Sequence, residues 1–365
     1  MNFEIGGIKL KLSSDIPFSD NTFHEKFNNF RIDEMGDFDV ELELIHNKDF
    51  PEVHGKMIYK KIPWEIYFDD EFYYYNMITK NNVNGKMLLG RFRKNYKKIE
   101  IFKGENYKNT FLKGNLNSFS SFPTDQIIFS QMLFQRDIVR DSPGIIFHSS
   151  GILRGEREEE SGIQDVGYSE KEDEELQNPK SKIQNPESVT LFCGHSGAGK
   201  STMIKLLMGE QSMVNGEREE ESGIQDVGYR MQDSEFSSFT VLNDDRIIIR
   251  KHGDIFFAYG TPWHGELPYV SNKSGMLDRI YILNKSNENS IEEVKDSEKF
   301  IILYQRTIKG LISSEFQENR MTFIEQLVKK VPIYRLNFRK DDPGKIREIL
   351  NFKFWILNCK NGYRI

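Results

Sequence analysis

Residues 189–208, with the sequence VTLFCGHSGAGKSTMIKLLM, limit the possible folds of this chain more than any other segment. The apolar run at 189–193 predicts a buried strand, and the residues after 200 combine good helix formers with apolar side chains at helical spacing. Between the two lies a complete GxxxxGKS loop. A strand, a glycine-rich loop and a helix in this order predict an α/β unit whose loop binds phosphate at the end of a strand.

The glycines and the two residues after them predict how this loop holds a nucleoside triphosphate. Gly194, Gly197 and Gly199 allow the backbone to curl with its N–H groups turned inward, beside the positive end of the helix dipole. Lys200 is expected to reach the terminal phosphates, and the Ser201 hydroxyl is expected to ligate the accompanying magnesium. A glycine-rich turn without a ligand is the structural alternative.

Composition sets the broad class of the protein. The 365 residues suffice for two domains, and the absence of a long apolar run or a signal-like N-terminus predicts a cytoplasmic protein without a membrane partner. Its two cysteines, Cys193 and Cys359, offer neither a disulfide framework nor a zinc site. The net charge of −6 comes from residues 154–175, where ten acidic side chains stand against three basic ones. The remainder is almost neutral, so no nucleic-acid partner is expected.

The first part of the chain, residues 1–120, is expected to form a smaller β-rich domain. Apolar and polar residues alternate over 40–44 and over 64–68, a pattern that predicts strands of an antiparallel sheet. Residues 121–137 then place apolar side chains at helical spacing after Pro123. This segment predicts a helix that joins the two domains.

Residues 121–340 are expected to form the phosphate-binding domain, an α+β or α/β fold with a mixed sheet. Short apolar or alternating runs predict strands at 144–147, 189–193, 240–242, 247–249, 254–260 and 279–283. A helix is expected at 316–330, followed by an edge strand at 333–338. The last residues, 341–365, predict a helical tail with a charged helix near 344–350.

A charged segment occurs twice in the second domain. Residues 155–168, GEREEESGIQDVGY, recur without change at 216–229, within charged inserts at about 154–187 and 212–237. A solenoid repeat would carry periodic apolar positions and would differ between copies, so these segments are interpreted as duplicated surface loops. The alternative is a paired acidic docking motif.

Two adjacent aspartates, Asp244 and Asp245, lie in a predicted hairpin after the phosphate-binding loop. At the end of a strand both side chains can turn toward the loop. One carboxylate would then hold magnesium, and the other would accept the proton of an attacking hydroxyl. A hairpin turn with two solvated acids is the alternative, because Asn-Asp-Asp is common in turns.

The ordered segments FHSSGIL, LFCGHSGAGKST, LNDDRIIIR and FFAYGTPWHGEL resemble the HPr kinase and phosphoenolpyruvate carboxykinase-like superfamily, in particular its small serine-kinase branch. The similarity covers roughly residues 120–340 once the two inserts are set aside. It implies a P-loop kinase domain of this type, with a mixed sheet, behind the smaller β-rich domain.

The resemblance also implies roles for individual residues. ATP would be bound by the loop residues Gly194, His195, Ser196, Gly197, Ala198, Gly199, Lys200, Ser201 and Thr202. Mg²⁺ would be held by Ser201 and by one of Asp244 and Asp245, and the other aspartate would be the base. Lys200 and both aspartates would be catalytic, together with His148, which would orient or tune the pair.

The TPWHGE loop at 261–266 has two interpretations. Trp263, His264 and Glu266 either close over the nucleotide or the acceptor, or belong to a turn that is anchored by its aromatic residue. The sequence favours neither interpretation.

Together these patterns predict a Mg-ATP-dependent kinase that transfers the γ-phosphoryl group to a hydroxyl, expected to be serine in a small protein, in a peptide or as the free amino acid. One alternative is a nucleotide-gated module that binds a peptide without turnover. Another is an ATPase of the ATP-binding cassette class, which SGAGKSTMIKLLMGE resembles. This class is disfavoured, because neither an LSGGQ-like signature nor a strand ending in Asp-Glu follows the loop. The acceptor and the oligomeric state have no signature in the sequence.

Overall fold

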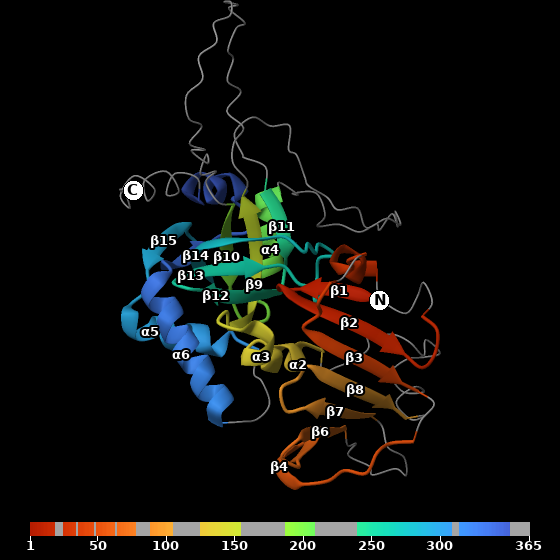
Figure 1. The fold of residues 1–365 in the computed structure, drawn as a ribbon. Helices are drawn as coiled ribbons and strands as arrows, with labels where there is room; N and C mark the ends of the chain where they lie inside the picture. The colour runs from red at the N-terminus through yellow and green to blue at the C-terminus, as the bar shows by residue number, and fades with distance from the viewer. Residues whose placement is uncertain are drawn as a thin grey trace, which may run out of the picture.

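The computed structural model folds the chain into a mixed α+β architecture with two mixed β-sheets and few helices (Figure 1). It describes residues 1–18, 25–33, 36–46, 49–62, 64–77, 88–104, 125–154, 187–208, 239–308 and 314–350. Both copies of the duplicated segment, and the end of the predicted tail, lie outside the described residues. The two sheets lie side by side, with α2 (Asp125–Met132) and α3 (Arg136–Val139) between them in Figure 1.

Eight strands form the N-terminal sheet, in the order β1-β2-β3-β8-β7-β6-β5-β4. They are β1 (Asn2–Ile5), β2 (Ile8–Ser14), β3 (Val40–Ile45), β4 (Lys56–Lys61), β5 (Trp64–Phe68), β6 (Phe72–Met77), β7 (Leu88–Arg93) and β8 (Lys98–Lys103). The prediction of an antiparallel sheet is wrong, because β3 runs parallel to both β2 and β8. A 3₁₀ helix, Glu25–Phe30, lies between β2 and β3 along the chain and buries Phe27 and Phe30. A connection of this kind, longer than a hairpin turn, allows two neighbouring strands to run parallel.

The helix predicted at 121–137 is present from residue 125 on but is broken into α2 and α3, and residues 121–124 lie outside the described residues. Phe134, in the break, packs edge-on against Phe316 and Phe323, with ring centroids 5.3 and 6.2 Å away. This tertiary contact outweighs the local helical preference of the segment.

The second sheet has the order β10-β9-β12-β13-β14-β16-β15, with β11 paired to β9 and a further pairing between β10 and β14. Its strands are β9 (Gly144–Arg154), β10 (Ser188–Cys193), β11 (Phe239–Asn243), β12 (Arg246–His252), β13 (Ile255–Tyr259), β14 (Ser274–Lys285), β15 (Ser290–Glu293) and β16 (Ile333–Phe338). The predicted strands of this domain are all present. The sheet is mixed, because β14 runs parallel to β10 and β16 and antiparallel to its third neighbour, β13.

Two features of this domain differ from the prediction. β16 is not an edge strand, because the short polar strand β15, which has no apolar run to predict it, pairs with its outer side. Helix α5 (Asp296–Gln305) is also absent from the predicted elements, while α6 (Ser314–Lys330) and the helical residues 343–350 confirm the two predicted helices. Among the helices that the structure describes, none is long and apolar enough to span a membrane.

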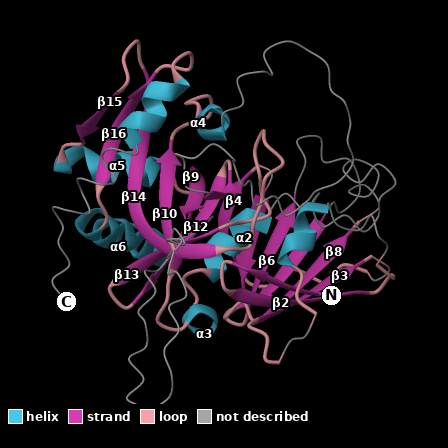
Figure 2. Cartoon of the chain, turned by 90° about the horizontal axis from the view of Figure 1, so that it is seen from above, coloured by secondary structure: helices cyan, strands magenta, loops and turns pink. Residues whose placement is uncertain are grey.

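Helices cover both faces of the second sheet (Figure 2). On one face Phe323 and Leu327 of α6 join a core cluster with Leu191 of β10. On the other face α4 (Lys200–Met208) packs in a cluster with Phe192 and Tyr281. Successive residues of a strand point to opposite faces, so β10 is buried on both sides. This packing fixes the end of β10, where the predicted phosphate-binding loop begins.

The N-terminal sheet is joined to the second sheet through β12. Phe3 and Ile248 belong to one core cluster that spans both sheets. Arg250 of β12 donates hydrogen bonds to the carbonyl oxygens of Gly6 (3.0 Å) and Gly7 (3.1 Å) in the turn between β1 and β2. The β-rich domain is therefore attached to the strand that begins directly after the two aspartates.

Candidate active site

The predicted phosphate-binding loop, residues 194–201, follows the carboxyl end of β10, and α4 begins at Lys200, as predicted. Gly197 and Gly199 adopt the left-handed backbone conformation, with φ of +77° and +100°. Residues with a Cβ rarely adopt this conformation, and at Gly199 a Cβ would also lie 2.6 Å from the ring of Phe338. The loop conformation therefore depends on these two glycines.

The loop residues predicted to bind nucleotide divide into an exposed tip and a more buried base. His195, Ser196 and Gly197 are exposed, Gly199, Ser201 and Thr202 are half-buried, and Gly194, Ala198 and Lys200 are buried. An anion in the loop can therefore meet backbone N–H groups at an exposed turn and the start of a helix.

Lys200 lies across the base of the loop. Its side chain is only 8% exposed, and Nζ lies 3.4 Å from the carbonyl oxygens of both Gly194 and His195, to which it donates. Nζ also lies 3.2 Å from Oδ1 of Asp245. The lysine therefore holds a positive charge between the loop and the acidic pair, where a bound phosphate could attract it.

Asp244 is fully buried and accepts three hydrogen bonds. Its Oδ1 accepts one from the backbone N–H of Gly265 at 2.6 Å. Its Oδ2 accepts one from the N–H of Leu267 and one from the Ser201 hydroxyl, both at 2.9 Å. Hydrogen bonds to an ionised carboxylate are stronger than those between neutral groups. They fix Asp244 beside the hydroxyl that is predicted to bind magnesium.

The TPWHGE loop holds Asp244 in place. Trp263 is buried and packs edge-on against Phe129 of α2, with ring centroids 5.1 Å apart. His264 is half-buried and Glu266 is exposed. The loop contacts the aspartate through the backbone N–H of Gly265, and the N–H of Leu267 directly after the loop adds a second contact, which favours the interpretation of an aromatic-anchored turn.

Gly265 donates a hydrogen bond to Asp244 and lies close to Asp245, so a substitution at this position tests the arrangement. A Cβ at this position would lie 2.8 Å from Cβ of Asp245 and 3.1 Å from Oδ2 of Asp244. Gly265→Ala is expected to displace the loop, to lower the free energy of unfolding by about 1–3 kcal/mol and to reduce nucleotide-dependent activity about tenfold or more. Urea unfolding and an activity assay measure the two effects. At Gly344 a Cβ would meet nothing within 4 Å, so Gly344→Ala is the control, and equal behaviour of both variants would contradict the prediction.

Asp245 faces three basic side chains. Its Oδ1 lies 3.8 Å from Nδ1 of His148, besides its contact with Lys200, and its Oδ2 pairs with the guanidinium of Arg246. Burial alone would raise the pKa of Asp245, but His148, Arg246 and Lys200 outweigh burial and lower the pKa to about 2. His148 and Lys200, two of the predicted site residues, therefore both lie beside Asp245, while Asp244 contacts Ser201.

The lowered pKa of Asp245 predicts how stability depends on pH. In the unfolded chain this carboxyl would have its ordinary pKa of about 4, so folding favours the ionised form. The resulting stabilisation is present above about pH 4 and is lost as the pH falls toward about 2. Urea unfolding of wild type and Asp245→Asn between pH 6 and pH 2 measures it. The difference in the free energy of unfolding between wild type and the variant is expected to shrink below pH 4. A difference that stays constant down to pH 2 would contradict the lowered pKa of Asp245.

The predicted site residues do not include those that shape the turn between β11 and β12. Oδ1 of Asn243 accepts the N–H groups of Asp245 (2.7 Å) and Arg246 (2.8 Å), and its Nδ2 donates to the carbonyl of Thr261 (2.8 Å). Nε of Arg246 donates to Oε1 of Gln126 in α2 at 2.9 Å. An asparagine before two aspartates is a recognisable turn signal, whereas the contact with Gln126 has no local signature.

The oxygen atoms beside the loop fit a magnesium ion. The Ser201 hydroxyl and the Asp244 carboxylate are adjacent, and Mg²⁺ prefers oxygen ligands. Within the described residues, no group of three or more His, Cys, Asp or Glu could hold a metal ion by itself. Mg²⁺ is commonly bound through one or two protein oxygens together with substrate phosphates and water. Ser201 and Asp244 are therefore the residues that would hold it.

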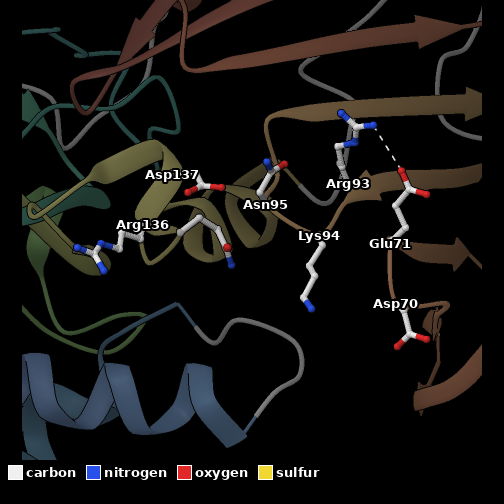
Figure 3. Close-up of a pocket in the computed structure, with 8 residues that line it drawn as sticks. Asp70, Glu71, Arg93, Lys94, Asn95, Arg136 and Asp137 are labelled. Carbon is white, nitrogen blue, oxygen red and sulfur yellow. Dashed lines mark hydrogen bonds and ion pairs between the residues drawn. The ribbon is translucent and has the colours of Figure 1, made fainter.

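A separate pocket lies between the N-terminal sheet and the start of the second domain. It has a volume of about 450 Å³ and is lined by Asp70, Glu71, Arg93, Lys94, Asn95, Gln135, Arg136 and Asp137. Figure 3 shows that Arg136 points away from Asn95, while Glu71 and Arg93 pair with each other at 3.4 Å. The pocket shares no residue with the phosphate-binding loop or the aspartate pair, so we assign it no part in phosphate chemistry.

No protein-family model, no curated protein and no solved structure matches this chain. The arrangement of the loop, the aspartates and their supporting residues is therefore interpreted from its own geometry.

Proposed function

We propose that this protein is a magnesium-dependent kinase that transfers the γ-phosphoryl group of ATP to a hydroxyl, that of serine in a small protein, in a peptide or as the free amino acid. Its second domain would be a P-loop kinase domain of the HPr kinase and phosphoenolpyruvate carboxykinase-like superfamily, in the small serine-kinase branch, and it would act in the cytoplasm. One observation carries the proposal: two adjacent carboxylates reach the phosphate-binding loop, Asp244 at Ser201 and Asp245 at Lys200.

These two contacts support different roles for the aspartates. Asp244 is buried, held by two backbone N–H groups and adjacent to Ser201, which suits a fixed metal ligand. The side chain of Asp245 is 24% exposed and lies beside Lys200, which would bind the terminal phosphates. An acceptor hydroxyl can therefore approach Asp245 but not Asp244, and we assign the metal side to Asp244 and the acceptor side to Asp245.

Asp245 would orient the acceptor hydroxyl and take up its proton. A carboxylate with a pKa of about 2 is a weak base, but phosphoryl transfer depends mostly on positioning and on neutralisation of charge. A phosphate in the loop would also attract Lys200 away from Asp245, which removes one of the charges that lower the pKa of Asp245. Bound magnesium would neutralise negative charge on the phosphates. His148 would keep the carboxylate oriented.

Mass spectrometry of possible acceptors tests this proposal. Wild type is incubated with Mg-ATP, free serine and a pool of serine-containing peptides, beside Lys200→Ala, Asp244→Asn and Asp245→Asn. A phosphorylated serine or peptide formed by wild type and lost in the variants is the expected result. Tight binding of ATP without any phosphorylated product would contradict the kinase and support the nucleotide-gated binding module. ADP and inorganic phosphate without phosphorylated acceptor would support an ATPase.

A further inference from the structure

The end of α5 brings Arg306 next to the candidate active site. Arg306 is the C-cap residue of α5, and its carbonyl oxygen accepts a hydrogen bond from the N–H of His148 at 2.6 Å. The next residue, Thr307, forms an antiparallel β-bridge with Phe147. The segment after α5 therefore runs beside the first half of β9, with Arg306 opposite His148.

The backbone pairing places Arg306 beside His148 of β9, next to the point where β10 ends at Cys193. On the opposite side of β9, His148 pairs with Arg246 of β12. Burial raises the pKa of the Cys193 thiol to about 12, and the nearby positive charges of Arg306 and Lys200 oppose this rise. The backbone of Arg306, next to His148, and Nζ of Lys200, 3.4 Å from the carbonyl oxygen of Gly194, therefore both lie near the end of β10.

Arg306 differs from the other two cations because no acidic residue in the described part of the chain pairs with it. Lys200 and Arg246 both contact Asp245. Nε of Arg306 is buried without a hydrogen-bond partner, and within the described part of the chain no carboxylate contacts its guanidinium. A buried charged donor that is left unpaired costs free energy. An anion bound at the neighbouring loop would supply the missing partner.

We propose that Arg306 binds the γ-phosphoryl group of the nucleotide held in the loop, as an arginine supplied by the same chain. This inference rests on the proposed function and adds a catalytic residue to it. A planar guanidinium matches two phosphate oxygens at once. It would stabilise negative charge on the phosphoryl oxygens while the bond from phosphorus to the ADP oxygen breaks and the bond to the acceptor oxygen forms. The hydroxyl proton passes to Asp245 in the same reaction.

Calorimetry with two nucleotides tests the contact, because Mg-AMPPNP, a non-hydrolysable ATP analogue, carries a γ-phosphoryl group and Mg-ADP does not. Arg306→Gln is expected to weaken binding of Mg-AMPPNP about 10- to 100-fold and to leave binding of Mg-ADP unchanged. Arg306→Lys should restore part of the affinity for Mg-AMPPNP. Arg93→Ala, which removes a half-exposed arginine of the N-terminal sheet, is the control and should change neither affinity.

The outcomes separate this inference from the proposed function. Equal losses for both nucleotides in Arg306→Gln, or no loss for either, would overturn the role of Arg306, because an arginine that only caps a helix does not distinguish ATP from ADP. If Arg306→Gln fails to fold, Arg306→Lys is used for the test instead. A ratio of the affinities for Mg-AMPPNP and Mg-ADP equal to that of wild type would then overturn the contact. A wild type that distinguishes the nucleotides through Arg306 but transfers no phosphoryl group would contradict the kinase alone. A wild type that binds neither nucleotide would overturn both.

Discussion

Replacement of Asp244 by asparagine is expected to reduce phosphoryl transfer by roughly 10³-fold or more. The two carboxylate oxygens accept different backbone N–H groups, Oδ1 that of Gly265 and Oδ2 that of Leu267. In Asp244→Asn one of these N–H groups must therefore face the amide NH₂, which is also a donor. The variant loses a negatively charged metal ligand as well. We expect its free energy of unfolding to fall by about 1–3 kcal/mol.

Single-turnover transfer and urea unfolding measure the two consequences of Asp244→Asn. Asp254→Asn is a suitable control, because Asp254 is 81% exposed in the β12–β13 hairpin and, among the described residues, pairs with Lys330 alone, at 3.7 Å. The control should match wild type in both measurements. Transfer by Asp244→Asn at the rate of wild type would show that Asp244 does not hold the metal.

Lys200→Ala is expected to lower phosphoryl transfer by about 10²- to 10³-fold and to weaken binding of Mg-ATP. The Nζ of Lys200 is buried between the loop carbonyl of Gly194 and the carboxylate of Asp245. No other side chain of α4 occupies this position, so the alanine variant leaves the terminal phosphates without this charge. Single-turnover transfer and calorimetry with Mg-ATP measure the effects.

Lys205→Ala is the matched control, because Lys205 belongs to the same helix but pairs with the exposed Glu266 at 3.4 Å. Its removal should leave both transfer and nucleotide affinity close to those of wild type. Similar losses in Lys200→Ala and Lys205→Ala would mean that general destabilisation of α4, and not a phosphate contact, explains the result.

Local patterns predict most of this fold, and long-range pairing decides the rest. The alternation of apolar residues predicts strands such as β3 and β5, since each has one face in a core. Strand neighbours are not a local property, so the parallel pairing of β3 and the inner position of β16 could not be predicted. The same limit explains the break between α2 and α3, which depends on the contact of Phe134 with α6.

In the candidate site, too, local sequence patterns predict some residues and long-range contacts decide the others. Its loop and its two aspartates form contiguous motifs, and glycine, lysine, serine and carboxylate at these spacings have a direct chemical meaning. The groups that fix the aspartates come from distant segments: Gly265 lies 21 residues beyond Asp244, and Gln126 lies 120 residues before Arg246. Only the fold brings these segments together, so their role could be recognised only once the chain was folded.

The central claim is that the phosphate-binding loop and Asp244 form one Mg-ATP site, and a crystal structure with Mg²⁺ and AMPPNP tests it most directly. We expect density for the γ-phosphoryl group beside Nζ of Lys200, and density for a metal ion in contact with Ser201 on the side of Asp244. A nucleotide bound elsewhere, such as in the pocket beside Arg93 and Asp137, or a metal ion bound away from Ser201, would contradict the claim.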